Sequence, residues 1–419
     1  MKGLTINLIL FVLLFASCTT YKNLYQGDFN DFYSDDIFPL NIDYKPHHIG
    51  NKNYQLHFQL SSENLIYQRN LDTDDYEAEL KINVVRYSGY GLQTKMDSVN
   101  STIKDRKIGD LKRIISGKMN LPFKLEHQNI LHIKATDLAR DFTEEFIVPI
   151  DTTLSNSSNY LVKRNSDGLP LLHTYVKNGL YYDISSVYLK SNELSALYYK
   201  ADFDLPSPPF SLKRPRKFDF EPEQNQMIEK REDATYLLRL QEENIVRIKD
   251  EVNGGDHSLI YFDSNYPKIT DYGQMLESIR YITSKEEYER ILGTEDKKLA
   301  LDEFWLDKAG SEERAKKMIR TYYQRAENAN KYFSCHTQGW KTDRGLIFII
   351  FGEPKTVTKT LDSEIWNYGE VGKFRSLNFR FVRVRNPFSD NDFRMIRKEE
   401  YKPVWYHFIG AWREGRIIN

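Results

Sequence analysis

Cysteine is almost absent from this chain of 419 residues, which contains only Cys18 and Cys335. With so few thiols, packing and not covalent cross-links must supply the stability of the fold. An excess of charge is also absent, because 59 Lys and Arg residues nearly balance 60 Asp and Glu residues. No net field would attract a polyanion, so we expect no nucleic-acid partner.

Common catalytic motifs are missing as well. The sequence has no His-Glu-x-x-His, Cys-x-x-Cys, Gly-x-Ser-x-Gly or P-loop pattern, so the usual zinc, nucleophile and nucleotide chemistries have no anchor. Two adjacent pairs remain, a candidate metal pair at His47-His48 and a candidate thiol-imidazole pair at Cys335-His336. Adjacent side chains rarely face each other, so we interpret the thiol-imidazole pair as structural. We expect no metal, no cofactor and no catalytic residue.

Long apolar runs are missing after residue 18, but one opens the chain. Residues 8–15 read Leu-Ile-Leu-Phe-Val-Leu-Leu-Phe, Lys2 precedes them, and Ala16 and Ser17 lead into Cys18. A spanning helix needs about 20 apolar residues, so this run is too short to be one. It resembles a bacterial lipoprotein signal peptide, with Phe15 where such signals usually have Leu. The resemblance implies that residues 1–17 are removed and that Cys18 is lipidated.

The lipoprotein resemblance also implies a location. Acyl chains on Cys18 anchor a protein to a membrane because each buried methylene contributes about 0.8 kcal/mol. Residues 18–40 are polar with scattered aromatics and read as a tether. Thr19 follows the cysteine in place of an acidic residue, which implies that the protein is sorted to the outer membrane. Surface-exported lipoproteins tend to carry acidic residues just after the cysteine, and here none precedes Asp28. The resemblance therefore implies a periplasm-facing orientation.

Two β domains are expected next. Residues 41–152 contain short alternating runs, such as 54–60 and 79–85, separated by Asn, Asp, Gly and Ser. This pattern is typical of an antiparallel sandwich of the immunoglobulin-like kind. A Ser- and Asn-rich stretch then interrupts it, and strand-like runs resume over 153–267. A Pro-, Lys- and Arg-rich segment at 206–217 interrupts this second β domain. Its basic run, 213–217, could contact phosphate or lipid head groups, but we expect it to be a solvated loop.

The hydrophobic period changes from two to 3.6 at about residue 270, which predicts a C-terminal α+β domain over 268–419. Ser284 and Glu287 form a capping box for one helix, and Ser311 caps a longer one. Residues 346–351 are all apolar, and we interpret them as a buried strand. Residues 377–385 read as a further strand, with a bulge between Phe381 and Val382.

One segment carries a family resemblance. Residues 339–345, Gly-Trp-Lys-Thr-Asp-Arg-Gly, stand between the long helix and the apolar run. Four flanking segments accompany it in order: Phe304-Trp305, Tyr322-Tyr323-Gln324-Arg325-Ala326, Phe351-Gly352-Glu353-Pro354 and Ile365-Trp366-Asn367-Tyr368. Together they resemble the GWxTD domain family, whose core would cover about 268–400. The resemblance implies an architecture and no established reaction.

The motif residues admit a structural interpretation. Gly339 and Gly345 permit backbone conformations that other residues resist. Trp340 can cover the end of the helix, while its indole N–H needs an acceptor. Thr342 and Asp343 can accept hydrogen bonds from free backbone N–H groups in a turn. We favour this structural role.

The alternative is a ligand or partner site. Asp343 and Arg344 could bind a ligand, with Glu353 and loop arginines nearby. This interpretation stays open, because the sequence does not show which of these side chains reach the surface.

Three functions follow from these observations. The favoured one is a non-enzymatic, membrane-anchored lipoprotein that acts as a scaffold or docks with another envelope protein. A glycan-binding lipoprotein is the second, although all five tryptophans lie in the C-terminal third. The third is a hydrolase with paired carboxylates such as Asp343 and Glu353, which would need to lie about 5 to 10 Å apart.

Overall fold

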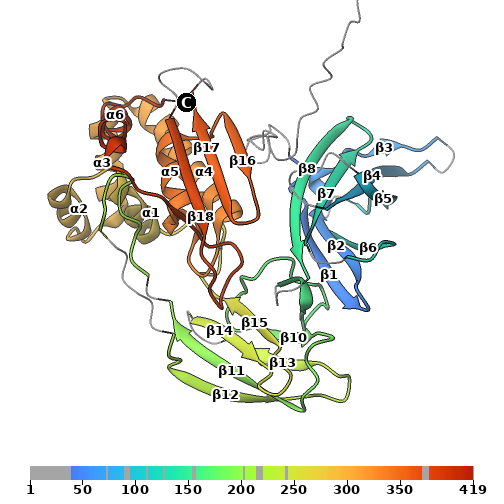
Figure 1. Cartoon of the computed structure of the whole chain (residues 1–419). Coiled ribbons are helices and arrows are strands. Elements are labelled where there is room, and N and C mark those ends of the chain that lie inside the picture. The colour runs from blue at the N-terminus through green and yellow to red at the C-terminus, as the bar shows by residue number, and fades with distance from the viewer. Residues whose placement is uncertain are drawn as a thin grey trace, which may run out of the picture.

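Three units follow one another along the chain (Figure 1). The computed structural model describes residues 39–418, apart from 72–73, 89–94, 110–111, 126–127, 153–156, 202, 214–219, 241–243 and 370–376. The expected signal peptide, Cys18 and nearly all of the expected tether lie outside the described residues.

The first unit is an antiparallel β-sandwich. One sheet has the order β1-β2-β6, and the other has the order β3-β4-β7-β8 with β5 paired to β4. The strands are β1 (Asp43–Gly50), β2 (Asn53–Ser61), β3 (Gln68–Arg69), β4 (Tyr76–Tyr87), β5 (Lys95–Arg106), β6 (Ile114–Leu121), β7 (Gln128–Asp137) and β8 (Phe142–Asp151). Alternate residues such as Leu56, Phe58, Leu80 and Ile82 fill the space between the sheets. The predicted sandwich is confirmed.

The second unit also has two antiparallel sheets, ordered β13-β10-β9 and β12-β11-β14-β15. Its strands are β9 (Leu161–Arg164), β10 (Tyr181–Ser185), β11 (Glu193–Lys200), β12 (Gln224–Glu229), β13 (Tyr236–Arg239), β14 (Asn244–Lys249) and β15 (Asp256–Ile260). Tyr182 and Ile184 of one sheet pack with Ala196, Val246 and Ile248 of the other. This unit follows the same alternation rule as the first.

The third unit, here called the helical unit, combines six helices with one sheet. Its helices are α1 (Tyr272–Ser278), α2 (Lys285–Leu292), α3 (Lys297–Ala309), α4 (Glu312–Phe333), α5 (Asp343–Phe351) and α6 (Lys402–Arg413). Its sheet has the order β16-β17-β18-β19, from β16 (Thr356–Lys359), β17 (Ser363–Tyr368), β18 (Leu377–Arg383) and β19 (Phe393–Met395). The expected α+β arrangement is confirmed, and the caps at Ser284 and Ser311 are both present.

Two local predictions were wrong. Residues 346–351 belong to helix α5 and not to a strand. All nine residues of α5 are buried, and a run that is apolar on every side carries no period that separates a buried helix from a buried strand. The bulge in β18 is also absent, because the pairing of β17 with β18 continues without a shift from Ser363↔Val382 to Tyr368↔Leu377.

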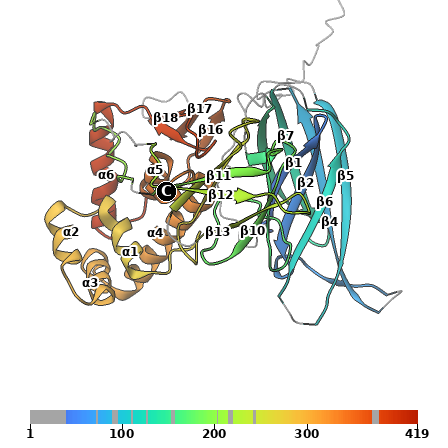
Figure 2. The same cartoon turned by 90° about the horizontal axis from the view of Figure 1, so that it is seen from below.

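Helix α5 is the centre of the helical unit. It packs against α4 through Phe348 and Phe333, whose ring centroids lie 5.6 Å apart, and against the sheet through Phe348 and Trp366 at 6.5 Å. On the third side Phe351 meets Phe408 of α6 at 4.3 Å. Helices α2 and α3 lie on the side of this unit farthest from the first β domain (Figure 2). A single core therefore surrounds the C-terminal part of the motif.

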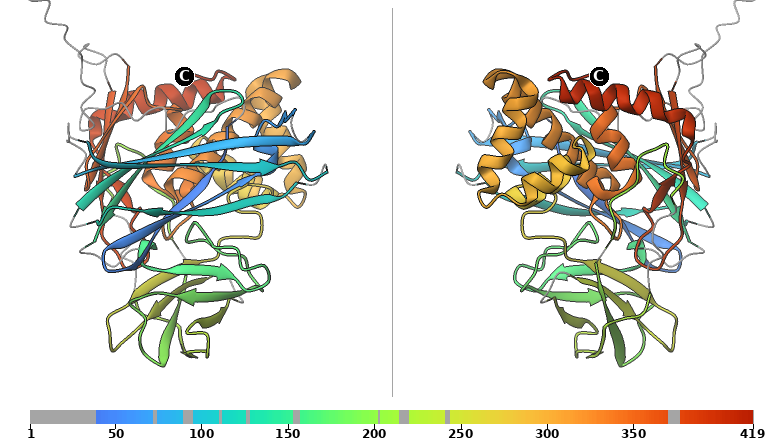
Figure 3. Two further views of the ribbon diagram at one scale, coloured as in Figure 1. Left: turned by 90° about the vertical axis from the view of Figure 1, so that its right-hand side faces the viewer. Right: turned by 90° about the vertical axis from the view of Figure 1, so that its left-hand side faces the viewer.

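The three units contact one another. The second β domain and helix α6 lie at opposite ends of the molecule (Figure 3). Tyr199, Ile245 and Ile260 of the second β domain form one apolar cluster with Tyr266 and Phe388. The first β domain contacts the second through Gln59, whose amide donates to Pro170 O at 2.7 Å. Within the described residues no helix is both long and apolar enough to cross a bilayer.

Residues 205–210, which precede the basic run, contact the helical unit. Leu205 and Phe210 pack on the core of the helical unit, and the Lys398 N–H donates to Pro209 O at 3.1 Å. Most of the basic run that follows, residues 214–217, lies outside the described residues. The segment that precedes it therefore fastens the second β domain to the helical unit.

Candidate functional site

The Gly-Trp-Lys-Thr-Asp-Arg-Gly segment turns the chain from α4 into α5. A short 3₁₀ turn, η5 (Gly339–Lys341), is followed at once by α5, with Thr342 as the N-cap. The Thr342 hydroxyl accepts from Gly345 N–H at 3.0 Å and donates to Gly339 O at 2.7 Å. Thr342 thus ties the two glycines together and satisfies one of the free N–H groups of the helix.

Both glycines are required by close backbone approach. A Cβ atom on Gly339 would lie 1.9 Å from the carbonyl oxygen of Ala329 in α4, and one on Gly345 would lie 2.1 Å from Gly339 O. Neither glycine is among the described residues with a positive φ. The sequence suggested unusual backbone conformations, but the structure gives steric space as the reason.

Trp340 is fully buried and has a partner for each polar group of its own. Its indole N–H donates to Gln338 Oε1 at 2.6 Å, and its backbone N–H donates to Asn330 Oδ1 at 3.1 Å. Its carbonyl accepts from the Tyr281 hydroxyl at 2.9 Å. These hydrogen bonds therefore hold η5 against α4 and against Tyr281, which follows α1.

Lys341 occupies the surface side of this ring. Its ammonium group lies 4.9 Å from the centroid of Trp340 and 2.8 Å from Glu277 Oε1. A cation over a tryptophan face is favourable by about 0.5 to 1 kcal/mol at a partly exposed site. The side chain of Lys341 thus helps to cover the tryptophan.

Asp343 is buried and paired. Its carboxylate accepts from the Met395 N–H at 2.8 Å and forms an ion pair with Arg397 at 2.5 Å. Arg397 also donates to Ser207 O at 3.1 Å, in the Pro-rich segment. Asp343 therefore connects the start of α5 with β19 and, through Arg397, with the second β domain.

Arg344 forms the second buried ion pair. Its guanidinium donates to Glu364 Oε1 at 3.0 Å and to the side chain of Asn391 at 2.6 Å. Burial raises the pKa of Glu364, but Lys359 and Arg344 outweigh that effect, and the pKa is lowered overall. The carboxylate is thus ionised and neutralised by its own neighbours, as a buried charge must be.

Two residues outside the motif complete its framework. The Tyr266 hydroxyl accepts from Gly339 N–H at 3.2 Å and hydrogen-bonds Ser334, and Asn330 donates to Pro267 O at 2.9 Å. Sequence reasoning missed Tyr266 because it lies 73 residues before Gly339. Asn330 was only weakly indicated by the sequence, as a polar residue near the end of the buried face of α4.

Glu353 is not brought to Asp343. Asp343 begins α5 and Glu353 is the second residue after its end, so about 13 Å of helix separates them at 1.5 Å per residue. Glu353 is exposed, whereas Asp343 is buried against Arg397. Paired-carboxylate hydrolysis needs a shorter separation and a free acid, so these two residues do not form such a pair.

The Cys335-His336 pair does not form a nucleophilic dyad. Burial raises the pKa of the Cys335 thiol to about 12, and the reactive species would be the thiolate. His336 instead lies 4.0 Å from Asp392 and packs against Phe203. Among the described residues no group of three His, Cys, Asp or Glu side chains is placed to hold a metal ion, His47 and His48 included.

Comparison with known proteins assigns the C-terminal part of the chain. Residues 245–414 match the family model of the GWxTD domain. The match begins within β14, ahead of the expected boundary at 268. Its first residue, Ile245, is also the residue that joins β14 to the apolar cluster with Tyr266.

Other comparisons add little. No curated protein matches the chain. The crystal structure of red sea bream transglutaminase is similar over 55% of this chain and 32% of that chain, with 8% sequence identity and a TM-score of 0.18. The chain thus spans about a third of the length of that structure, and a TM-score this low does not establish a shared fold.

Proposed function

We propose that this protein is a non-enzymatic envelope lipoprotein, anchored to the outer membrane through Cys18 and facing the periplasm, that acts as a scaffold for another envelope protein. In this proposal the two β domains and the GWxTD domain present surfaces to a partner. Nothing in the proposal requires a bound small molecule.

The observation that carries the scaffold role is the use made of the motif. Trp340, Thr342, Asp343 and Arg344 are all buried, and each one has a hydrogen-bond or ion-pair partner within the same chain. Side chains that hold two ion pairs and a helix cap cannot also coordinate a substrate without unfolding their surroundings. The motif thus builds the domain, and contacts with a partner fall to the surface around it.

The anchor rests on the sequence around Cys18. If Cys18 carries acyl chains, residues 18–40 span at most about 75 Å when fully extended, at about 3.3 Å per residue. That length would let the folded units reach partners well away from the membrane surface, with the lipid supplying the attachment.

Two measurements test the proposal in cells. Growth with a fatty-acid analogue should label the protein and should not label the Cys18→Ser variant, whereas Cys335→Ser should be labelled like the parent. Equal labelling of Cys18→Ser and the parent would remove the anchor from the proposal.

Cross-linking in intact cells followed by affinity purification tests the scaffold role. A discrete envelope protein should be recovered with the parent and lost with Cys18→Ser. Recovery of polysaccharide or peptidoglycan fragments in place of a protein would support the glycan-binding alternative and contradict the scaffold.

A further inference from the structure

Five of the nine histidines gather where the first and second β domains meet. His47, His48 and His57 belong to the first domain, and His173 and His257 belong to the second. His47 Nδ1 donates to Ser158 O at 3.2 Å across the contact, and the His48 ring stacks on Tyr188 at 5.4 Å. More than half of the histidines of the chain therefore lie at this one contact.

Lys45 lies in the middle of this histidine cluster. It is only 6% exposed and stands directly opposite His57 in the pairing of β1 with β2. It acts electrostatically on His47, His57, His173 and His257. No hydrogen-bond or ion-pair partner of its ammonium group is found in the described part of the chain, although buried lysines are normally paired.

The other charged groups that face the cluster are also cations. Lys118 and Lys163 act on His57, and Arg164 acts on His173. The acid on β1, Asp43, interacts with Lys331 of the helical unit. The remaining titratable groups at the contact are the phenols of Tyr54, Tyr160, Tyr175 and Tyr188. The charged side chains that act on His47, His57, His173 and His257 are thus cations, whereas the carboxylate of Asp43 acts on Tyr175, which stacks on His173.

Burial and these cations depress the basicity of the cluster. Burial first, and the neighbouring cations second, lower the pKa values of His47 and His57 to about 4, although the bond to Ser158 acts in the opposite direction on His47. Burial lowers the pKa of Lys45 to about 8. The imidazoles are therefore neutral when the two domains are docked at pH 7.5.

We propose that the contact between the two β domains is an acid-labile hinge, which is closed near neutral pH and opens when the buried histidine cluster takes up protons. Separation would return His47 and His57 to water, where the pKa of an imidazole is about 6.5. The separated state then binds more protons than the docked state between pH 6.5 and pH 4, so docking weakens as the pH falls through that window.

The size of the effect follows from the same shift. At pH 5, a change in pKa from about 6.5 to about 4 weakens docking roughly 30-fold for each imidazole, and roughly 1000-fold for two independent ones. Opening must also break the contact of the first domain with the helical unit, where Ile130 is buried in the core cluster of that unit, Tyr87 and Ile147 pack on it, and Lys331 donates to Asn41 at 3.0 Å. Two imidazoles are therefore enough to shift a docked equilibrium of a few hundred to one toward the open form.

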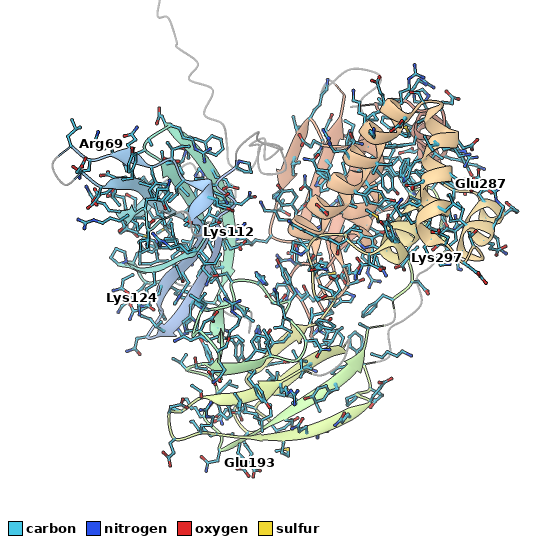
Figure 4. The ribbon with its side chains drawn as sticks, turned by 180° about the vertical axis from the view of Figure 1, so that it is seen from behind. Arg69, Lys112, Lys124, Glu193, Glu287 and Lys297 are labelled. Carbon is cyan, nitrogen blue, oxygen red and sulfur yellow. The ribbon has the colours of Figure 1, made fainter. Side chains whose placement is uncertain are left out.

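A pair of spin labels can measure the opening. Lys112 and Glu193 are exposed and belong to different β domains (Figure 4). The spin labels are attached through Lys112→Cys and Glu193→Cys in the full chain in detergent. The additional substitution Cys18→Ser leaves the buried Cys335 as the remaining native thiol. Pulsed electron–electron spin resonance should give one narrow distance at pH 7.5, a broad second population at pH 5.0, and the narrow distance again after return to pH 7.5.

Variants separate the hinge from other effects of acid. The double variant His47→Gln, His57→Gln should stay closed at pH 5.0, and Lys45→Met should open only at a lower pH, because removing the cation makes protonation easier in the docked state. His407→Gln, on the exposed face of α6, is the matched control and should open like the parent.

Two results of the distance measurement would overturn the hinge. One is a parent distance that does not change between pH 7.5 and pH 5.0, and the other is a double variant that opens as the parent does. All five tryptophans lie in the helical unit, so their emission reports whether that unit remains folded. A loss of that emission together with the distance change would show general acid unfolding and would also contradict the proposal.

Discussion

Replacement of Trp340 by alanine tests whether the motif holds the GWxTD domain together. The ring is fully buried between η5, α4 and Tyr281. A buried tryptophan withdraws about 200 Å² from water, which at about 25 cal/mol/Å² corresponds to about 5 kcal/mol. Truncations of large aromatics in cores cost about 3 to 5 kcal/mol, so we expect Trp340→Ala to lower the free energy of unfolding by that amount.

The measurement is urea denaturation followed by tryptophan emission and by far-ultraviolet circular dichroism. Four tryptophans remain in the variant, all in the same unit, so the emission still reports its unfolding. Trp340→Phe keeps most of the ring but loses the N–H bond to Gln338, and it should fall between the parent and the alanine variant. Tyr406→Ala removes an exposed aromatic of α6 and should change stability by less than about 0.5 kcal/mol.

Recovery of the cross-linked partner completes the test. If Trp340→Ala unfolds at the same urea concentration as the parent but loses its partner, the motif is a binding surface and the structural reasoning is refuted. If the variant unfolds at a lower urea concentration and partner recovery falls only in proportion to the folded fraction, the motif supports binding by stabilising the fold.

Two further predictions concern the same unit. Gly339→Ala should destabilise the helical unit by about 1 to 3 kcal/mol, because the new Cβ would overlap a backbone carbonyl of α4. Gly410→Ala, in open space on α6, should stabilise the unit by about 0.5 to 1 kcal/mol. Equal effects of the two variants in denaturation would contradict the close approach of Gly339 to α4. The pKa of Glu287 is lowered to about 2, chiefly by Arg413, so Glu287→Gln should cost about 1 to 2 kcal/mol at pH 7 after allowance for solvent screening. The contribution of Glu287 is present above pH 4.5 and is lost as the pH falls toward 2, so the free energies of unfolding of the parent and of Glu287→Gln should converge near pH 2. Glu289→Gln, in an exposed ion pair on the same helix, should match the parent at every pH.

Local signals in the sequence predicted much of the fold. The capping box at Ser284 and the cap at Ser311 were found because a cap depends on residues within one turn of it. The alternation of apolar and polar residues predicted both β domains, because it too depends only on residues close together in the sequence. The segment 346–351 was predicted wrongly, because its helical start is marked only by Thr342. A threonine three residues before a glycine is a weak cap signal, and the apolar run behind it fits either structure.

The site was predicted only in outline. The sequence favoured a structural role for the motif, and the buried contacts of Trp340 and Thr342 have that character. The partners of Asp343 and Arg344 could not be predicted, because Arg397 and Glu364 lie 54 and 20 residues away and meet the motif only through tertiary packing. The same limit applies to Tyr266.

The junctions between the units differ in physical character, and this difference bears on how an anchored scaffold would move. The second β domain joins the helical unit through an apolar cluster that includes Ile245 and Tyr266, and through the hydrogen bond of Tyr266 to Gly339. The first β domain joins the second through polar side chains and uncompensated imidazoles around Lys45. Apolar burial changes little with pH, whereas docking through the buried imidazoles weakens as the pH falls from 6.5 toward 4. If the hinge opens as proposed, the first β domain would stay with the N-terminal tether, and the second β domain would swing together with the GWxTD domain as one body.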